Sequence, residues 1–303
     1  ALAQSEQQAT TLDRVEVTGS RIRSVDAETS QPVLVLDRAE IEKQGVTSVA
    51  EVLSRISANG AGINRTFNNG GDGSAEISLR NLGSSRTLVL VDGRRWVSSL
   101  GGSVDLNTIP AAIIERIEVL KDGASSIYGS DAIAGVVNII TRDNFDGAEF
   151  RTHYGQFNQG DGERNSIDGT IGFNGDRGNL VMSLSRVEEK AVMAGDRAIS
   201  AVPVFGRGSA NFSGFSANGR IWDAGPDGED SIVVRPGATP TGAGRYALDQ
   251  FVPFAAQDRY NFAADNYLLT PQTRTSLYTK GRYDLTDSIS FRADAMYNER
   301  RSE

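Results

Sequence analysis

Residues 114–142, IERIEVLKDGASSIYGSDAIAGVVNIITR, decide the fold of the chain. The part up to Leu120 is rich in isoleucine, valine and leucine and predicts a strand. Lys-Asp-Gly at 121–123 ends that strand, because Asp and Gly tolerate the positive φ of a turn. Residues 125–128 predict one helical turn that the next glycine stops. The apolar run at 135–140 is typical of a second strand buried on both faces, so the stretch predicts a compact strand–turn–helix–strand unit.

This stretch resembles the end of the plug domain of TonB-dependent outer-membrane receptors. The match is long and ordered, and it consists of Ile117-Glu118-Val119-Leu120-Lys121, Gly123-Ala124, Tyr128-Gly129, Ala132 and Ala134-Gly135-Val136-Val137-Asn138-Ile139-Ile140-Thr141. A glycine-rich phosphate-binding loop of an enzyme is the alternative interpretation. It lacks support, because the stretch contains neither G-x-G-x-x-G nor G-x-x-x-x-G-K-[ST].

Length and composition restrict the classes of protein to consider. The chain has 303 residues, a net charge of −8 and a pI of about 4.9, with no cysteine and a single histidine, His153. The acidic balance argues against a nucleic-acid-binding protein, which needs a basic stripe. A chain without cysteine has no disulfides and no thiolate metal site, and we expect no metal and no cofactor. His153 lies on the polar face of a predicted strand and is expected to form hydrogen bonds.

No apolar run approaches the roughly 18–20 residues of a membrane-spanning helix. The longest candidate, residues 132–140, is interrupted by Gly135 and Asn138. If the chain crosses a membrane, it must therefore do so with strands that close into a barrel, since lipid leaves no backbone amide unpaired.

The N-terminus reads Ala1-Leu2-Ala3, which is typical of the end of a secretory signal peptide. We interpret residues 1–12 as a signal-peptide remnant and a flexible segment. In residues 13–19, DRVEVTG, two valines alternate with polar residues, as in an extended segment. In the family this position holds the TonB box, which adds as a strand to the edge of the energy-coupling protein TonB. The resemblance implies that TonB binds Asp13, Arg14, Val15, Glu16, Val17 and Thr18; a flexible tail is the alternative.

The resemblance extends upstream, and we place the plug domain at 31–143. Residues 33–36 predict a short strand. Two capping boxes, at 37–40 and 48–51, then predict two helices. The second helix is expected over 49–56, with its apolar residues at helical spacing and facing the core.

A glycine- and asparagine-rich loop is predicted at 59–74, NGAGINRTFNNGGDGS. In the family such a loop rises to the outer face of the plug, where the ligand arrives. The resemblance therefore suggests candidate ligand-binding residues in this loop and in the hairpin after it: Arg65, Phe67, Asn68, Asn69, Arg95 and Trp96. A solvated polar loop without a ligand is an equally good interpretation.

Strands are predicted at 76–80 and 87–91, and Asp92-Gly93 predicts a hairpin turn. Asn81 stands where the family more often has glycine, and asparagine tolerates the left-handed conformation of such a turn. Charges on a buried plug need partners. We therefore expect ion pairs that break on gating among Arg80, Arg86, Asp92, Arg94, Glu115, Arg116, Glu118 and Lys121.

After Arg142 the sequence changes to a period of two. Five segments, 148–157, 166–174, 179–188, 275–285 and 288–298, are apolar on one face and polar on the other. The apolar faces contain Phe150, Tyr154, Ile167, Ile171, Phe173, Leu180, Met182, Leu184, Leu277, Tyr283, Leu285, Ile289, Phe291 and Tyr297. Barrel strands with lipid outside fit this pattern, although a soluble β-sandwich would alternate in the same way. Tight turns at 174–178 and 284–287, beside a very long connection at 191–272, favour the barrel.

The connection at 191–272 contains ten of the chain's 22 aromatic residues. We expect most of them to pack within the loop, and stacking on a sugar or an aromatic chelate is the alternative. Residues 223–230, DAGPDGED, are expected to be a solvated acidic turn, because their spacing does not match a calcium-binding EF-hand.

The predicted fold class is an α+β plug domain followed by antiparallel transmembrane β-barrel strands at 147–303. Barrels of this family have about 22 strands, so we expect the chain to be the N-terminal part of a longer receptor. The implied function is TonB-dependent active transport of a scarce ligand, iron-siderophore-like or carbohydrate, and not catalysis. The implied location is the outer membrane of a Gram-negative bacterium, with the N-terminus in the periplasm. The implied partners are TonB, outer-membrane lipid and a small extracellular ligand, either a metal chelate or an oligosaccharide. The alternatives are a soluble periplasmic ligand-binding or interaction module and an outer-membrane signal-transducing receptor.

Overall fold

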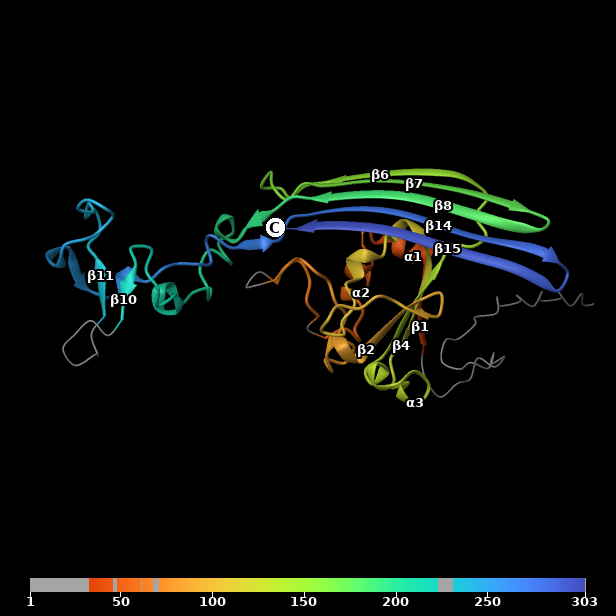
Figure 1. The fold of residues 1–303 in the computed structure, drawn as a ribbon, viewed down its shortest axis with the longest axis horizontal. Coiled ribbons are helices and arrows are strands. Elements are labelled where there is room, and N and C mark those ends of the chain that lie inside the picture. The colour runs from red at the N-terminus through yellow and green to blue at the C-terminus, as the bar shows by residue number, and fades with distance from the viewer. Residues whose placement is uncertain (1–32, 46–47, 61, 68–70, 223–230, 303) are drawn as a thin grey trace, which may run out of the picture.

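The computed structural model describes residues 33–45, 48–60, 62–67, 71–222 and 231–302. They form an N-terminal domain, a long sheet that lies over it, and an extended loop beyond one end of the sheet (Figure 1). The N-terminal domain contains β1 (Val33–Asp37), α1 (Arg38–Lys43), α2 (Val49–Ser54), η1 (Ser84–Arg86), β2 (Thr87–Val91), β3 (Arg94–Arg95), η2 (Leu106–Thr108), η3 (Ala111–Ile113), β4 (Ile114–Leu120), α3 (Ser125–Tyr128), η4 (Ser130–Ala132) and β5 (Gly135–Thr141), where η marks 3-10 helices.

The strands of the N-terminal domain form one mixed sheet in the order β1-β4-β5-β2-β3. β2 and β5 are parallel, and the other neighbours are antiparallel. β2 is buried along its whole length and β5 almost so, which confirms the prediction of a strand buried on both faces. Ile41 of α1 and Leu53 of α2 pack in the cluster on one face, and Ala124 and Ala132 beside α3 pack on the other.

The two predicted capping residues cap their helices. The Asp37 carboxylate accepts from Glu40 N at 2.7 Å, and the Ser48 hydroxyl accepts from Glu51 N at 3.2 Å. The second helix ends at Ser54, two residues earlier than predicted. The reason is that the next two amides bond to carbonyls three residues back, which tightens the final turn.

The strand predicted at 76–80 is wrong. Ile77, Ser78 and Leu79 are all buried, without the alternation of a half-buried strand. Only an isolated bridge between Asn59 and Leu79 joins the segment to another in ladder geometry. The amide of Ser78 donates to Asn59 Oδ1 at 3.1 Å, and that of Leu79 donates to Thr87 Oγ1 at 3.1 Å. Because side-chain oxygens take the place of a neighbouring strand, the segment is extended without belonging to a sheet.

Gly135 begins β5 with φ of +131°. A Cβ at this position would lie 2.4 Å from the carbonyl oxygen of Leu120 and 2.8 Å from Leu79 Cδ1. We predict that Gly135→Ala lowers the free energy of unfolding by about 1–3 kcal/mol, because it adds a clash to a strained backbone. Gly93, in the confirmed hairpin turn, is the control: it has φ of +75° and would meet no atom within 4 Å. Thermal unfolding should show the smaller shift for Gly93→Ala, and equal shifts would contradict the argument.

The long sheet consists of β6 (Gly147–Gly155), β7 (Arg164–Gly175), β8 (Gly178–Glu189), β14 (Gln272–Thr286) and β15 (Ile289–Ser302). Its order is β15-β14-β8-β7-β6, and every neighbouring pair is antiparallel. The five segments predicted from the period of two are therefore strands of one sheet.

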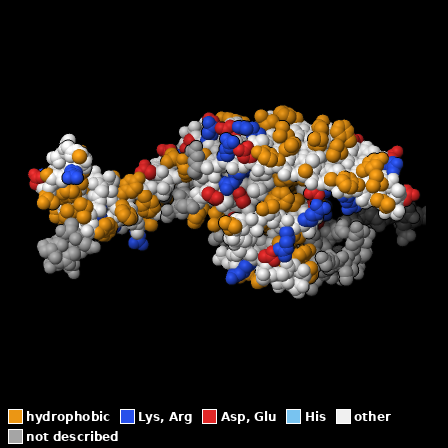
Figure 2. All heavy atoms as spheres, viewed as in Figure 1, with side chains coloured by type: hydrophobic (Ala, Val, Ile, Leu, Met, Phe, Trp, Pro, Cys, Tyr) orange, Lys and Arg blue, Asp and Glu red, His pale blue; other side chains and the backbone are white. Residues whose placement is uncertain are grey.

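The two faces of the long sheet differ as the period predicts. The fourteen side chains predicted on the apolar faces are all exposed, from 38% for Met182 to 71% for Phe150. Apolar side chains accordingly cover much of the upper surface of the sheet in Figure 2. The opposite face lies against the N-terminal domain and buries polar residues such as Ser183, Ser185 and Ser276.

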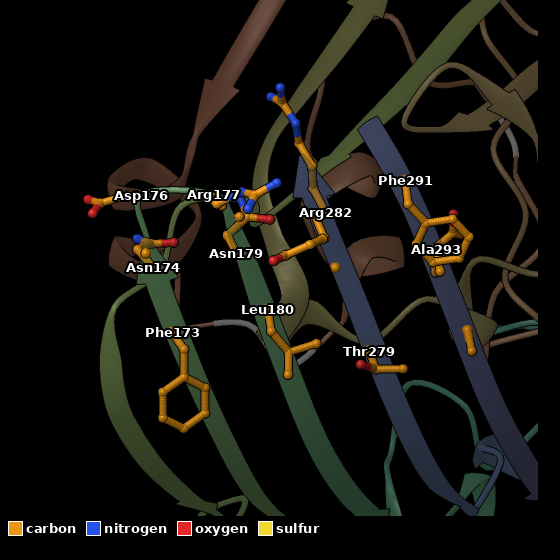
Figure 3. A pocket seen from close by; sticks show the side chains of 16 residues that line it. Phe173, Asn174, Asp176, Arg177, Asn179, Leu180, Thr279, Arg282, Phe291 and Ala293 are labelled. Carbon is orange, nitrogen blue, oxygen red and sulfur yellow. The ribbon is translucent and has the colours of Figure 1, made fainter. Parts of the chain in front are cut away.

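The exposed face of the long sheet has a hollow of about 790 Å³ (Figure 3). Gly281 of β14 pairs in register with Ala293 of β15, and these small residues form its floor. Leu180, Tyr283 and Phe291 stand around them. The hollow thus arises where small side chains interrupt an otherwise bulky apolar face.

The chain between β8 and β14 has structure of its own. β9 (Val192–Met193) pairs with β13 (Tyr267–Leu269), while β10 (Arg220–Ile221), β11 (Ile232–Val234) and β12 (Phe251–Pro253) form a small sheet, with 3-10 helices η5 (Ala194–Asp196), η6 (Gly208–Asn211), η7 (Leu248–Gln250) and η8 (Ala256–Asp258). The Arg220 guanidinium lies 3.4 Å from the Trp222 ring and 3.8 Å from the Phe254 ring, so these aromatic residues pack within the loop. The acidic run at 223–230 lies outside the described residues.

None of the helices in the described part of the chain has the length and apolar character needed to span a membrane.

Candidate functional site: the interface between the N-terminal domain and the long sheet

Four groups of charged side chains join the N-terminal domain to the polar face of the long sheet. On the sheet they are centred on Glu189, Glu149, Lys280 and Arg300. Charges taken out of water hold two surfaces together only where each has a partner, so the burial and pairing of each group decide its strength.

Glu189 is the centre of the most buried group, with 2% of its side chain exposed. Its Oε1 accepts from Arg65 Nη1 at 2.8 Å and lies 2.9 Å from Arg164 Nη2. Its Oε2 accepts from Gln272 Nε2 at 2.6 Å and from Arg274 Nη2 at 3.2 Å. Glu189 ends β8 and pairs in register with Arg164 of β7 and with Gln272 of β14. Strand register therefore brings Arg164 and Gln272 beside the carboxylate, Arg274 lies two residues further along β14, and Arg65 comes from the N-terminal domain. We call this set the Glu189 cluster.

The N-terminal domain adds two further acceptors to the Glu189 cluster. Glu51 of α2 accepts from Arg164 Nη2 at 2.5 Å. Asn107 Oδ1 accepts from Arg274 Nη1 at 3.1 Å. The helix that the second capping box begins is thus tied to the sheet at the end where the long loop departs.

Arg65 reaches the Glu189 cluster from the predicted loop at 59–74. It also donates from Nη2 to the carbonyl of Lys190 at 3.1 Å. Burial lowers the pKa of Arg65, and the Glu189 carboxylate opposes this effect by stabilising the charged form. Loss of Glu189 would therefore leave the Arg65 charge buried without this compensating carboxylate, whereas Glu189 has Arg164 and Arg274 as further partners.

The Glu149 group joins α1 to β6. Arg38 Nη2 and Arg142 Nη2 lie 3.3 Å and 3.1 Å from the Glu149 carboxylate, and Arg151 Nη2 lies 2.6 Å from Glu42. Burial lowers the pKa of Arg38, and the positive charges of Arg142 and Arg151 lower it further. Arg38 remains well satisfied, because its Nη1 also donates to the carbonyl of Ile114 at 2.6 Å.

The Lys280 group joins the hairpin turn after β2 to the middle of the sheet. Lys280 Nζ donates to Asp92 Oδ2 at 3.0 Å, and Arg94 Nη1 donates to Asp294 Oδ1 at 2.6 Å. Lys280 and Asp294 are cross-strand partners on β14 and β15. The turn therefore presents a carboxylate and a guanidinium group to the ammonium group of Lys280 and the carboxylate of Asp294 on the sheet. Thr141 supports Asp92 with bonds from its amide at 2.9 Å and its hydroxyl at 2.6 Å.

The Arg300 group lies near the end of β15. Arg300 Nε is 3.0 Å from Asp105 Oδ2, and its Nη2 is 3.4 Å from Asp72 Oδ2. Hydrogen bonds from the side chain and backbone of Ser74 lower the pKa of Asp72, so this carboxylate stays ionised beside the guanidinium.

A polar cavity of about 1100 Å³ lies between the N-terminal domain and β8, β14 and β15. Several residues singled out from the sequence line it: Asp92, Arg94, Arg95, Trp96, Glu115, Arg116 and Glu118. The sequence thus identified much of the lining of the cavity, although it gave no indication that a cavity exists.

Of the eight residues predicted to form gating ion pairs, two pair with the long sheet in the described part of the chain: Asp92 and Arg94. Arg116 pairs with Glu118 at 2.8 Å, and Arg80 lies 3.7 Å from Asp122, both inside the N-terminal domain. For Arg86, Glu115 and Lys121 the described residues provide no ion pair. That these contacts break on gating stays a prediction.

The predicted ligand-binding residues fall into two places. Arg65 belongs to the Glu189 cluster, and Phe67 in the same loop is 49% exposed. Asn68 and Asn69 lie outside the described residues. The remaining two, Arg95 and Trp96, line the polar cavity: Arg95 pairs with Asp131, and Trp96 Nε1 donates to Thr108 Oγ1 at 2.8 Å.

The Glu189 cluster and the polar cavity lie at different positions along the strands of the sheet. Gln272 of β14 belongs to the Glu189 cluster, and Lys280 of the same strand borders the cavity. Eight residues separate them, which corresponds to roughly 26 Å at about 3.3 Å per residue. The candidate ligand-binding residues therefore do not form one site in this structure.

Sequence reasoning missed the Glu189 cluster. The one available signal was the period of two, which places Glu189 on the same face as Ser183 and Ser185. That face buries the residue, and a buried carboxylate needs cationic partners.

His153 lines a smaller pocket of about 410 Å³ beside Arg38 and Asp168. No hydrogen bond to its imidazole occurs within the described residues, so its predicted role as a hydrogen-bonding residue is not realised there. The same residues contain no group of three or more His, Cys, Asp or Glu side chains arranged to hold a metal ion.

Comparisons with known proteins agree with this geometry. The family model of the TonB-dependent receptor plug domain matches residues 25–136. This chain contains a TonB-dependent receptor plug domain. The vitamin B12 transporter BtuB of Vibrio vulnificus (strain CMCP6) is 40% identical to it over 135 residues, which are 45% of this chain and 22% of that transporter.

Solved structures share the arrangement of plug domain and strands. A mutant ferric enterobactin receptor of Pseudomonas aeruginosa, PfeA, has a TM-score of 0.55 at 17% identity, covering 90% of this chain and 34% of the receptor. The ferric citrate transporter FecA in its unliganded form has a TM-score of 0.53 at 15% identity, covering 91% of this chain and 32% of FecA. The plug domain is thus followed by antiparallel strands with the fold of a receptor barrel, which does not close within these residues.

Proposed function

We propose that this chain belongs to a TonB-dependent transporter of the outer membrane, in which the plug domain obstructs a barrel that begins with β6. One observation carries the proposal: the plug domain is attached by ion pairs to the polar face of a sheet whose other face is exposed and apolar. A soluble protein would bury that apolar face, whereas lipid would cover it in a membrane.

TonB is the proposed energy-coupling partner, through residues 13–18. This segment lies outside the described residues, so its sequence alone supports the assignment. Strand addition by main-chain hydrogen bonds requires an extended segment, which the alternation of Val15 and Val17 with polar residues favours.

The ligand is proposed to belong to one of three classes. A cobalamin is supported by the relative at 40% identity, which is a vitamin B12 transporter. A ferric siderophore is the class that the enterobactin receptor binds. An oligosaccharide is retained because exposed aromatic residues of the long loop, such as Phe215 and Trp222, could stack on sugar rings.

Uptake measurements in paired host strains test the proposal. The full-length protein would be produced in strains with and without TonB, and each would receive labelled cyanocobalamin, ferric enterobactin and maltodextrin. We expect accumulation of at least one probe in the TonB-containing strain only. Equal accumulation in both strains, or a protein found free in the periplasm, would overturn the proposal.

Leu184 offers a test of the membrane-facing surface. It lies near the middle of β8 and is 57% exposed on the apolar face. Leu184→Arg should reduce the amount of protein assembled in the outer membrane, because arginine at the centre of a lipid-facing strand costs about 2–4 kcal/mol. Leu248→Arg is the control, since Leu248 is 90% exposed in the long loop. Fractionation of membranes should show loss for the first variant alone; equal assembly of both would indicate that β8 does not face lipid.

A further inference from the structure

The hollow on the exposed apolar face of the long sheet is a feature that the transport function does not explain. Its volume is about 790 Å³, and it extends across β7, β8 and β14 to β15. Gly281 of β14 pairs in register with Leu180 of β8, and the missing side chain of the glycine leaves the space. β7, β8 and β14 each have a neighbour on both sides, so closure of the barrel at β6 and β15 leaves their outward face uncovered.

The length of the hollow along the strands matches one leaflet of a bilayer. Its lining on β14 includes Thr279 and Tyr283, which lie four residues apart, or roughly 13 Å at about 3.3 Å per residue. Half of a hydrocarbon core of about 30 Å is about 15 Å. One end of the hollow is the tight turn at 175–178, and short turns of such barrels face the periplasm. The hollow therefore corresponds in position to the periplasmic leaflet.

A guanidinium group stands at the mouth of the hollow, beside this turn. Arg177 Nε donates to the carbonyl of Asp284 at 3.1 Å and its Nη2 donates to that of Leu285, while the guanidinium lies 5.4 Å from the Tyr283 ring. The Asp284 carboxylate is occupied by Arg282 Nη2 at 3.0 Å. No ion pair to Arg177 occurs within the part of the chain that the structure describes. These contacts hold the Arg177 side chain in place and leave its positive charge available.

The charges at the mouth match a zwitterionic phospholipid headgroup. Asp176, next to Arg177, is exposed as well, and both stand at the turn, with Leu180 and Phe173 further from it (Figure 3). A phosphate accepts charge-assisted hydrogen bonds from a guanidinium group, and an ammonium group donates them to a carboxylate. An acyl chain in the hollow touches side chains on both flanks, and so gains more dispersion contacts than a chain on an evenly filled surface.

We propose that the hollow binds one zwitterionic phospholipid of the periplasmic leaflet, with an acyl chain over Gly281 and its phosphate at Arg177. The site lies on the face of the sheet opposite to the plug domain, so it is separate from the transported ligand. This inference rests on the outer-membrane location in the proposed function and adds to it a lipid that stays with the protein.

Photo-cross-linking tests the site in the full-length protein. The detergent-solubilised protein would receive increasing amounts of phosphatidylethanolamine with a diazirine in one acyl chain, and mass spectrometry would identify the labelled residues. We expect labelling at Leu180 and Tyr283 to saturate at a stoichiometric amount of lipid. Leu184, on the same face but outside the hollow, should be labelled only in excess lipid. A parallel rise at all three positions would overturn the inference, because it would show ordinary contact with bulk lipid.

Gly281→Leu fills the hollow, and Gly169→Leu is its matched control. Gly169 lies on the same face of β7, outside the hollow, and a Cβ there would meet no atom within 4 Å. A Cβ at Gly281 would lie 3.3 Å from Leu180 Cδ1, the end of a flexible side chain that can move aside. We expect Gly281→Leu to reduce saturable labelling of Tyr283 at least fivefold, and Gly169→Leu to reduce it less than twofold. Equal effects of the two variants would contradict the proposed site.

Arg177→Gln tests the headgroup, and it keeps the inference testable if Gly281→Leu fails to assemble. Glutamine can still donate to the carbonyls of the turn but has no charge. The lipid concentration for half-maximal labelling should rise at least threefold, and Arg207→Gln, at an exposed arginine of the long loop, should leave it unchanged. Unlabelled phosphatidylethanolamine should displace the probe at least threefold better than phosphatidylglycerol. Unchanged binding to Arg177→Gln, or equal displacement by the two lipids, would refute the zwitterionic occupant.

Leu184 separates failure of the inference from failure of the proposed function. Labelling at Leu184 in excess lipid without a saturable component at Tyr283 would reject the inference alone. Absence of labelling at Leu184 in lipid bilayers would reject the outer-membrane location, and the inference with it. A dimer in detergent that Gly281→Leu dissociates would also reject the inference, because the hollow would then be covered by a second copy of the chain.

Discussion

Glu189→Ala is expected to loosen the plug domain more than any other single substitution at the interface. The change removes the carboxylate shared by Arg65, Arg164 and Arg274 and leaves their charges in a buried site. Breaking a buried pair in this way costs roughly 3–5 kcal/mol. The measurement is the urea concentration at which a protease begins to cleave the plug domain of the detergent-solubilised protein, which should fall markedly.

The neighbouring residue provides a matched control. Glu188 is 42% exposed, and its carboxylate lies 3.8 Å from Lys190 Nζ. Glu188→Ala should therefore change stability by less than about 1 kcal/mol. Glu189→Gln keeps the shape and one acceptor but removes the charge, and it should fall between the two. If alanine at 188 and alanine at 189 gave the same urea midpoint, the Glu189 cluster would not hold the plug domain.

Val17→Pro should reduce TonB-dependent uptake by more than about tenfold, because proline cannot donate to a strand ladder and its ring disturbs the pairing. The effect should appear equally in binding of the purified protein to the periplasmic domain of TonB. The amount of protein in the outer membrane should not change, since the segment precedes the plug domain.

Val17→Ala distinguishes the contribution of main-chain hydrogen bonds to TonB binding from the contribution of the valine side chain. Alanine keeps the amide donor, so uptake should stay within about threefold of the unmodified protein if main-chain bonds provide most of the binding. Normal uptake with proline at position 17 would show that this segment does not pair with TonB as a strand.

Local signals explain why much of the fold could be predicted. The caps at Asp37 and Ser48 depend on residues three positions apart, and the Asp92-Gly93 turn depends on two adjacent residues. The long strands follow from a period of two that each segment contains in itself. In each of these cases the physical cause lies within a few residues of its effect. The strand wrongly predicted at 76–80 fits this explanation, because side chains from other segments take its backbone donors.

The Glu189 cluster could not be predicted in the same way. Glu189 meets Gln272 across 83 residues and Arg65 across 124 residues. The period of two indicates that Glu189 faces the plug domain, but its sheet partners Arg164 and Gln272 are brought to it by the register between β7, β8 and β14, and Arg65 by the packing of the plug domain on the sheet. A shift of one residue in either pairing would place Arg164 or Gln272 on the opposite face. The period of two in the sequence therefore indicates that the Glu189 carboxylate is buried, but it does not identify the cationic side chains that neutralise it.

The central claim is that the long sheet has lipid on one face and the plug domain on the other, and spin labels along β8 test it most directly. Single cysteine substitutions would be labelled in the full-length protein in lipid bilayers, at the following positions: Leu180, Val181, Met182, Ser183, Leu184 and Ser185. Relaxation by oxygen, which concentrates in lipid, should be high at 180, 182 and 184 and low at 181, 183 and 185, where the plug domain covers the sheet. Oxygen exposure without this alternation, or with its maxima at 181, 183 and 185, would contradict the account.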